Sequence, residues 1–334
     1  MGFINDRAYF GNMAQVFGSK EYIMTGGIAD GLRAVDLYNN AGLRMTLLPG
    51  RALDIGELSV GGKNVSFISA SGYSASGYTD RQSDWARSFC GGFLYTCGLD
   101  NIGVPNEDEG TNLCQHGSLS FVPAENVAIT TDETNPDNPV ITVSGIINTA
   151  FLFGNKLKLR RSISLGYNDL FFTINDTVVN EGFLPAEYLM LYHMNFSYPF
   201  VDENSGLVVN DIGCTPRDDE AKAGFETRKA YEKPVVGYKE QVFYYDVKDD
   251  NSRCAAALTS PNCGLRCTVE YPKDPLNTLT QWKNVAAGDY VTAIEPSTGE
   301  VCGRSQTRKD GKLLWLQPGE RKNIYITVTF SELK

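Results

Sequence analysis

Apolar and polar residues alternate with a period of two along much of this chain, and that pattern is typical of β-strands. Within 156–165, Leu157, Leu159, Ile163 and Leu165 share one face, while the opposite face carries lysine, arginine and serine. Residues 324–330 repeat the pattern, with isoleucine, valine and phenylalanine alternating with tyrosine and threonine. Because successive side chains of a strand point to opposite sides, both segments are predicted to be half-buried antiparallel strands.

Turn residues separate further runs of this kind. The pair Gly61-Gly62 lies between two alternating runs within 54–67, which predicts a two-residue hairpin turn with positive φ. Long amphipathic helical patterns are missing, and the one short candidate helix covers residues 82–89. Further strands are predicted near residues 31–38, 42–48, 139–147, 169–179, 187–194, 206–212, 237–247, 253–260, 265–271, 290–295 and 312–317.

These features predict an all-β fold built as a large antiparallel β-sandwich. The sequence contains no internal repeat, low-complexity tract or linker, and all-β proteins of more than about 200 residues commonly form one domain. We therefore expect a single domain over residues 1–334, with residues 1–20 as a candidate irregular extension.

Charge limits the classes of partner. The chain carries 40 acidic and 30 basic residues, a formal net charge of −10, and no basic run interleaved with aromatic residues. Such a chain repels phosphate backbones and anionic lipid surfaces, so we expect no nucleic-acid partner and no membrane partner. A small uncharged or polar ligand is easier to accommodate.

Location and redox state follow from weaker signals. No basic segment followed by an apolar core opens the chain, and no apolar stretch approaches the length that spans a bilayer, which indicates a cytoplasmic protein. The eight cysteines are expected to be buried free thiols. The one close pair, Cys263 and Cys267, lacks the second pair that a zinc ribbon requires.

Only two histidines occur in the 334 residues, so imidazole chemistry must use one or both of them. His116 precedes Gly117, which allows close approach of backbone or ligand. His193 ends an apolar run and stands shortly before the polar Asn195. Each is a candidate for the lining of a cleft, although a satisfied core histidine is an equally ordinary role for an isolated imidazole.

A carboxylate completes the set of candidates. Glu295 lies between Ile294 and Pro296 at the end of an apolar strand pattern, which is an unusual place for a solvated surface charge. A turn-capping role is the alternative. The sequence has no phosphate-binding loop and no strand-linked Gly-x-Gly-x-x-Gly, so no nucleotide cofactor is expected. Two histidines cannot make a three-histidine zinc site, but a metal site of His116, His193 and Glu295 remains a minority alternative.

Taken in order, several short phrases resemble the galactose mutarotase-like superfamily, and more closely its branch of aldose 1-epimerase family proteins carrying an uncharacterised domain. The resemblance covers most of the chain and is carried by the order of the phrases. They include Gln115-His116-Gly117 and Ile294-Glu295-Pro296, together with residues 50–56, 89–103, 123–126, 176–182, 192–195, 198–199, 303–304 and 316–320.

The resemblance implies an antiparallel β-supersandwich whose concave face binds a sugar without a cofactor or metal. It implies that His116 binds the sugar, that His193 is the general acid and that Glu295 is the general base. The segment around His193 departs from the family pattern, because Tyr192 stands where the family has asparagine. Asn195, Arg51 and Arg304 lie in matching phrases and are predicted to bind substrate, with a salt bridge as the alternative for each arginine.

The chemistry of these groups agrees with the resemblance. Opening a hemiacetal ring requires a base at the anomeric hydroxyl and an acid at the ring oxygen, and each positioned proton transfer contributes roughly 10²- to 10⁴-fold. We therefore expect a cofactor-independent aldose 1-epimerase acting on a free or modified aldose. A non-catalytic carbohydrate-binding protein, a metal-dependent hydrolase or isomerase and a two-carboxylate glycosidase are the alternatives. Residues 213–235 are predicted to form a loop over one end of the cleft.

Overall fold

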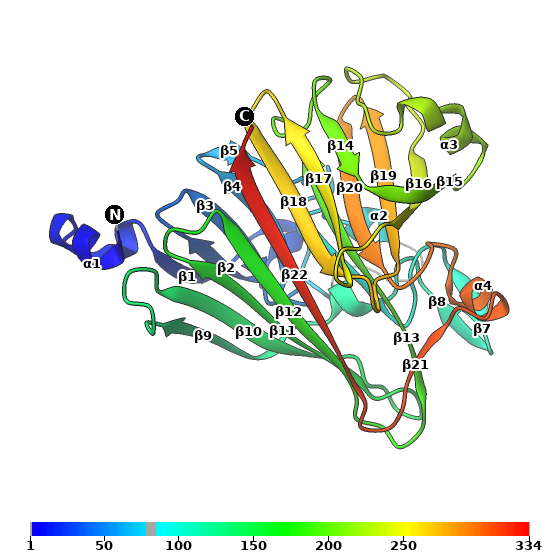
Figure 1. Cartoon of the computed structure of the whole chain (residues 1–334). Helices are drawn as coiled ribbons and strands as arrows, with labels where there is room; N and C mark the ends of the chain where they lie inside the picture. Colours follow the sequence, from blue (N-terminus) through cyan, green and yellow to red (C-terminus); the bar gives the residue numbers. More distant parts are fainter. Residues whose placement is uncertain (1, 78–84, 334) are drawn as a thin grey trace.

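Two antiparallel sheets stacked on one another hold most of the chain in the computed structural model, which describes residues 2–77 and 85–333 (Figure 1). Among the described residues, the larger sheet has twelve strands: β1 (Gly18–Ile23), β2 (Arg33–Tyr38), β3 (Leu43–Leu48), β4 (Asp54–Val60), β5 (Lys63–Asn64), β6 (Leu94–Leu99), β13 (Ala186–Ser197), β15 (Asp211–Pro216), β16 (Gln241–Val247), β19 (Thr278–Ala286), β20 (Asp289–Ser297) and β21 (Leu314–Leu316).

The smaller sheet has eight strands among the described residues, and a separate two-stranded ribbon stands beside the main sheets. The smaller sheet comprises β9 (Glu125–Asp132), β10 (Val140–Asn148), β11 (Leu157–Gly166), β12 (Phe171–Asn180), β14 (Gly206–Val209), β17 (Arg253–Ser260), β18 (Leu265–Pro272) and β22 (Arg321–Glu332). The ribbon pairs β7 (Asn106–Asp108) with β8 (Thr111–Leu113).

Helices are short wherever the structure describes the chain. The α-helices are α1 (Phe3–Asp6), α2 (Trp85–Ser88), α3 (Asp219–Ala223) and α4 (Arg304–Lys309). The 3₁₀ turns are η1 (Arg7–Tyr9), η2 (Met13–Gln15), η3 (Gly27–Ala29), η4 (Leu119–Phe121) and η5 (Phe225–Thr227). The predicted all-β sandwich is thus confirmed. The predicted hairpin is confirmed as well, because Gly61 and Gly62 form the turn between β4 and β5 with φ angles of +56° and +78°.

Seven of the described strands were not predicted, and burial explains two of them. β6 is buried at all six positions, so its sequence cannot alternate. β9 is the edge of the smaller sheet and is almost wholly exposed, so it lacks an apolar face. The others are β1, β7, β8, β15 and β19.

Three local predictions need correction. Residues 1–20 are not simply irregular, because short helical turns precede β1 and Phe3 packs edge-on against Tyr167 with ring centroids 5.0 Å apart. The candidate helix over 82–89 is reduced to α2, and residues 82–84 lie outside the described part of the chain. Segment 213–235 opens as an edge strand, β15, because its backbone pairs with β16, and only then turns into α3 and η5.

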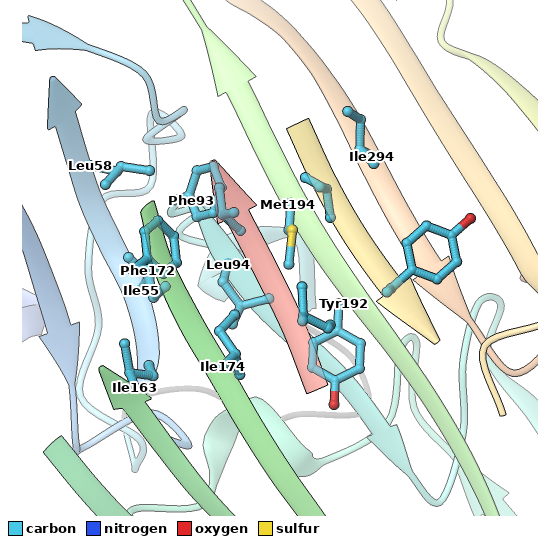
Figure 2. Packing of buried hydrophobic residues seen from close by; sticks show 14 of the residues in the cluster. Ile55, Leu58, Phe93, Leu94, Ile163, Phe172, Ile174, Tyr192, Met194 and Ile294 are labelled. Carbon is cyan, nitrogen blue, oxygen red and sulfur yellow. The ribbon is translucent and has the colours of Figure 1, made fainter. Parts of the chain in front are cut away.

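The hydrophobic core fills the space between the two sheets. Figure 2 shows Ile163, Phe172 and Ile174 of the smaller sheet facing side chains of the larger sheet. The same cluster contains residues from Phe17 to Phe330, so nearly the whole length of the chain contributes to it. The single-domain organisation stays a prediction that this core agrees with.

β13 is the central strand that links this core to the opposite face of the larger sheet. Its residues from 188 to 196 are all buried, because both faces of the strand are covered. Tyr192 and Met194 point into the core between the sheets, whereas Leu189 and Leu191 belong to a second cluster on the other face. Since side chains alternate, His193 also faces away from the core.

A buried ion cluster crosses the core between the sheets. Arg161 on β11 lies 2.7 Å from Asp176 on β12 and 2.9 Å from Asp54 on β4 of the larger sheet. The hydroxyl of Tyr192 donates to Asp176 at 2.8 Å. One guanidinium is therefore the shared counter-ion of two buried carboxyl groups.

Replacing Arg161 by methionine should lower the free energy of unfolding by about 3–5 kcal/mol, because removing one partner of a buried ion pair leaves uncompensated charge. Urea denaturation measures the change. The matched control is Arg160→Met on the same strand, whose half-exposed side chain pairs with Glu181 and should cost about 1 kcal/mol or less. Equal losses in the two variants would contradict the account.

Candidate active site

A cavity of about 150 Å³ opens on the face of the larger sheet that points away from the smaller sheet. His116, His193 and Glu295 all line it, so the structure brings together the three residues that the sequence singled out. Three aromatic side chains, Trp85, Phe89 and Trp282, line it as well. The space is suited to a single small ligand.

Strand register places the polar groups in one row across this face. His193 on β13 pairs with Tyr95 on β6. The pairing of Met194 with Ile294 puts Glu295 of β20 across from His193, and Glu295 pairs in turn with Thr280 on β19. Each of these residues faces away from the core, because its neighbours in sequence point into it.

The imidazole of His193 and the carboxyl of Glu295 are in contact. Nε2 of His193 lies 3.4 Å from Oε1 of Glu295, and both side chains are nearly inaccessible to solvent. Burial is the main factor that lowers the pKa of His193 to about 3, and His116 acts in the same direction. Burial also raises the pKa of Glu295 well above its usual range, aided by Glu240 and opposed by Arg217.

These opposite shifts determine where the proton of the pair resides. Both shifts favour a protonated Glu295 beside a neutral His193, because burial disfavours both charged forms. The separation of 3.4 Å agrees with this state, since charge-assisted N–H···O bonds are typically about 2.7–2.9 Å long. In this state the pair shares one proton in addition to the N–H proton that a neutral imidazole always carries.

His116 is oriented by its own backbone and by Gly103. It has a φ of +58°, and its N–H donates to the carbonyl of Gly103 at 2.8 Å. The N–H of Gly103 donates in return to Nδ1 of His116 at 3.3 Å, so the proton of the neutral ring is on Nε2. Burial lowers the pKa of His116 to about 4, which keeps the ring neutral.

The segment that carries His116 leaves room only for glycine at the next position. Gly117 has a φ of +75°, and a Cβ there would stand 2.6 Å from the carbonyl oxygen of Gly98. Asp100 holds the following residue, since its carboxylate accepts from the N–H and the hydroxyl of Ser118, both at 3.0 Å. The turn is therefore fixed on both sides of Gly117.

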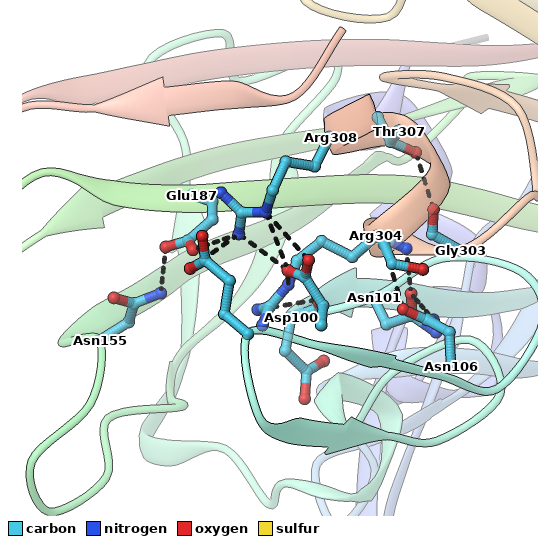
Figure 3. A network of polar contacts seen from close by, with 12 residues as sticks. Asp100, Asn101, Asn106, Asn155, Glu187, Gly303, Arg304, Thr307 and Arg308 are labelled. Carbon is cyan, nitrogen blue, oxygen red and sulfur yellow. Dashed lines mark hydrogen bonds and ion pairs between the residues drawn. The ribbon is translucent and has the colours of Figure 1, made fainter. Parts of the chain in front are cut away.

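Asp100, which holds this turn, also belongs to a polar network with Arg304 and Arg308 of α4, and Figure 3 shows that network. Arg304 donates its N–H to Asn101 at 2.8 Å and its Nη1 to the carbonyl of Asp100 at 3.3 Å. Its Nε lies 2.7 Å from Asp108, which Arg308 contacts at 2.8 Å. Arg304 is thus a positioning residue for the segment that carries His116.

The other predicted substrate-binding residues also lie outside the cavity lining. Arg51 is buried and donates to the carbonyls of Ser74, Ser88 and Ser120 at 2.8–3.3 Å. Asn195 is buried and donates to the carbonyl of Gly92 at 2.9 Å. Like Arg304, both side chains stabilise backbone segments near the site and do not line this cavity.

Two charged lining residues were missed by the sequence reasoning. Arg217 and Glu240 form an ion pair of 3.0 Å at the cavity, and Glu240 also accepts from Nε1 of Trp282 at 2.7 Å. Arg217 lies 2.8 Å from Asp218 as well. Arg217 falls within the segment predicted to lie over the cleft, but nothing in the sequence distinguishes Glu240 from the other acidic residues.

Within 2–77 and 85–333, no group of three or more His, Cys, Asp or Glu side chains is arranged to hold a metal ion. In the same part of the chain, no helix has the length and apolar character needed to cross a bilayer.

Acid should destabilise the protein partly through His116. The unfolded chain takes up a proton near the ordinary pKa of 6.5, whereas the folded chain resists protonation until about pH 4. The free energy of unfolding therefore falls as pH falls through this window, and His116 alone contributes about 3 kcal/mol of the loss by pH 4. In urea denaturation at a series of pH values, His116→Gln should decline less steeply than wild type. Carboxylates titrating in the same window affect both proteins equally, so identical slopes would contradict the assignment.

Solved structures with the same architecture come from several bacteria. A protein of Klebsiella pneumoniae subsp. pneumoniae MGH 78578, provisionally named an aldose 1-epimerase, matches with a TM-score of 0.89 and 22% identity over 96% of this chain and 88% of its own. A galactose mutarotase-like protein of Clostridium acetobutylicum matches with a TM-score of 0.64 and 13% identity over 95% and 99%. A galactose 1-epimerase of Lactobacillus acidophilus NCFM matches with a TM-score of 0.58 and 13% identity, also over 95% and 99%.

At these identities the likeness establishes the fold alone, which is that of the galactose mutarotase-like proteins. No curated protein matches the sequence. One family model matches residues 29–330, which is most of the chain. The chain therefore belongs to the family described as "Domain of unknown function (DUF4432)".

Proposed function

We propose that the protein is a cofactor-independent aldose 1-epimerase acting on an uncharged aldose. The observation that carries the proposal is the contact between His193 Nε2 and Glu295 Oε1, 3.4 Å apart in a cavity of monosaccharide scale. A pair that shares one proton has the composition that hemiacetal opening requires. One group accepts a proton as the other donates one, and the total stays constant.

The proton movements can be followed atom by atom. Glu295 as base takes the proton of the anomeric hydroxyl, and His193 as acid gives its proton to the ring oxygen, so the C1–O bond breaks and the aldehyde forms. Rotation about the C1–C2 bond presents the other face of the carbonyl. Closure then reverses the two transfers, with Glu295 returning a proton to the carbonyl oxygen and His193 taking one from the hydroxyl.

Opening in this direction starts with the shared proton on His193, whereas the pKa shifts of the two groups favour Glu295 as its holder. The proton must therefore pass from Oε1 to Nε2 when the sugar binds. Hydroxyl groups that donate to the Glu295 carboxylate stabilise its charged form and favour this transfer. The neutral His116, with its proton on Nε2, is suited to donate a hydrogen bond to a sugar oxygen.

Other parts of the lining fit a sugar. Trp85, Phe89 and Trp282 offer planar faces for the C–H surface of a pyranose ring. Three buried polar atoms of lining residues have no hydrogen-bond partner within the described residues: His193 Nδ1, Thr280 Oγ1 and Trp85 Nε1. Buried polar atoms are usually satisfied, so hydroxyl groups of a ligand are suitable partners.

The charge of the lining favours an uncharged substrate. Arg217 is held between Glu240 and Asp218, so its positive charge is already balanced by carboxylates. Arg51 and Arg304, which would favour a phosphate or sulfonate, point their donors into the protein interior. A phosphorylated aldose would therefore meet no unbalanced cation among the described lining residues.

A non-catalytic carbohydrate-binding protein is the second candidate. It is favoured by the same pKa shifts, because a neutral His193 beside a protonated Glu295 is a stable hydrogen-bonding surface that needs no proton transfer. The two candidates differ in turnover rather than in the ligand.

NMR exchange spectroscopy on a panel of free aldoses separates the candidates. Wild-type protein should accelerate α/β interconversion of at least one neutral aldose, and His193→Ala and Glu295→Gln should each reduce the enzymatic rate by about 10²- to 10⁴-fold. Glu270→Gln, on the smaller sheet away from the cavity, is the control and should retain the wild-type rate. Ligand-induced shifts without faster exchange would favour the binding protein, and undiminished exchange in both site variants would contradict the mechanism.

A further inference from the structure

Five large apolar side chains stand exposed on two neighbouring loops at one end of the smaller sheet. One loop joins β10 to β11 and the other joins β12 to β13. We call these five residues the apolar tip, and their exposed fractions are 54% for Phe151, 79% for Leu152, 97% for Phe153, 95% for Phe183 and 77% for Leu184. Single exposed apolar residues are ordinary, but a contiguous group of this kind marks an interaction surface.

The two loops are held against each other and form one platform. The N–H of Glu181 donates to the carbonyl of Lys156 at 2.9 Å, just beyond the last pair of the β11–β12 ladder, Leu157 and Asn180. The side chain of Asn155 donates to Glu187 on β13 at 3.1 Å. The apolar tip is therefore attached to the sheets through several hydrogen bonds from both loops.

The exposed area is of the size that a stable association buries. Three phenylalanines and two leucines at these exposed fractions present roughly 700–800 Å² of mostly apolar surface. A standard protein interface buries about 800 Å² on each partner, and the largest apolar patch of a typical monomer is about 300–600 Å². The apolar tip alone approaches one side of such an interface.

The same loops also enclose a hollow. It has a volume of about 780 Å³, and its lining combines Leu152, Phe153, Phe183 and Leu184 of the apolar tip with polar and charged residues that include Lys158 and Glu181. A surface that carries both projecting rings and a hollow is suited to pairing with itself. A two-fold axis lets the rings of each copy enter the hollow of the other, which is the condition for a closed dimer.

The charges around the hollow agree with a second copy as the occupant. Lys158 and Arg160 pair with Glu181 at 2.6 and 3.2 Å, so the rim carries both signs and can face an identical rim. A lipid surface would more commonly be met by a cluster of unpaired cations, and the net charge of −10 opposes anionic lipid. We propose that the apolar tip is the surface through which two copies of this chain associate as a two-fold dimer.

The apolar tip and the candidate active site are made of different residues. None of the five residues of the apolar tip is among the described residues that line the cavity of His193 and Glu295. Association and turnover are therefore separate properties, and either can fail without the other.

Sedimentation velocity of the full chain over a range of concentrations tests the proposal. Wild-type protein should sediment as a particle of twice the chain mass of 36.7 kDa. The double variant Phe153→Ser/Phe183→Ser should sediment as the monomer, with a dissociation constant raised by about 10²- to 10³-fold, because two aromatic anchors are lost. Val236→Ser, an equally exposed apolar side chain on a different loop, is the matched control and should leave the dimer intact.

A second measurement locates the contact directly. A photo-crosslinking phenylalanine analogue at position 153 should couple two chains, and mass spectrometry should find the adduct within 149–156 or 181–186. A dimer that persists in the double variant, or adducts elsewhere, would overturn the proposal. A wild-type protein that stays monomeric at all concentrations would overturn it as well. In that case, if wild-type protein floats with phosphatidylcholine vesicles and the double variant does not, the apolar tip is assigned to a lipid surface.

Discussion

The alternation of side chains along β13 is the constraint on which both the core and the candidate site depend. Tyr192 and Met194 close the space between the sheets, and His193 therefore faces the cavity on the other side. β20 follows the same rule, with Ile294 in the core and Glu295 in the cavity. A shift of either strand by one residue would place a carboxyl or an imidazole in the core and separate the pair.

Burial controls the chemistry of the site as much as geometry does. The side chains of His193 and Glu295 are nearly inaccessible to solvent, so burial disfavours charge on both of them, and a single shared proton suits the pair. Between the sheets, by contrast, Arg161 supplies a counter-ion to the buried Asp54 and Asp176. The contrast separates a structural ion cluster from a site whose neutral pair is available for proton transfer.

Much of the fold and the central part of the site could be predicted from the sequence. Period-two patterns predicted strands such as β10, β11 and β22, since each has one face in the core and one outside it. β6 and β9 lack such a pattern, because one is covered on both faces and the other on neither. His116, His193 and Glu295 were recognisable by rarity and context, whereas Glu240 reaches the cavity only through the pairing of β16 with β19. For Arg51 and Arg304 the sequence left substrate binding and a structural role both open, because it does not show which way a guanidinium points.

The central claim is that both imidazoles are neutral at pH 7 and that Glu295 holds the proton of the pair. Because the chain has only two histidines, ¹⁵N NMR of histidine-labelled protein resolves each ring, and His193→Ala assigns them. The account predicts two neutral rings at pH 7, with the proton of His116 on Nε2, and no titration until the pH approaches about 4. An imidazolium signal for His193 at pH 7 would contradict it, because the pair would then be an ion pair with Glu295 already ionised.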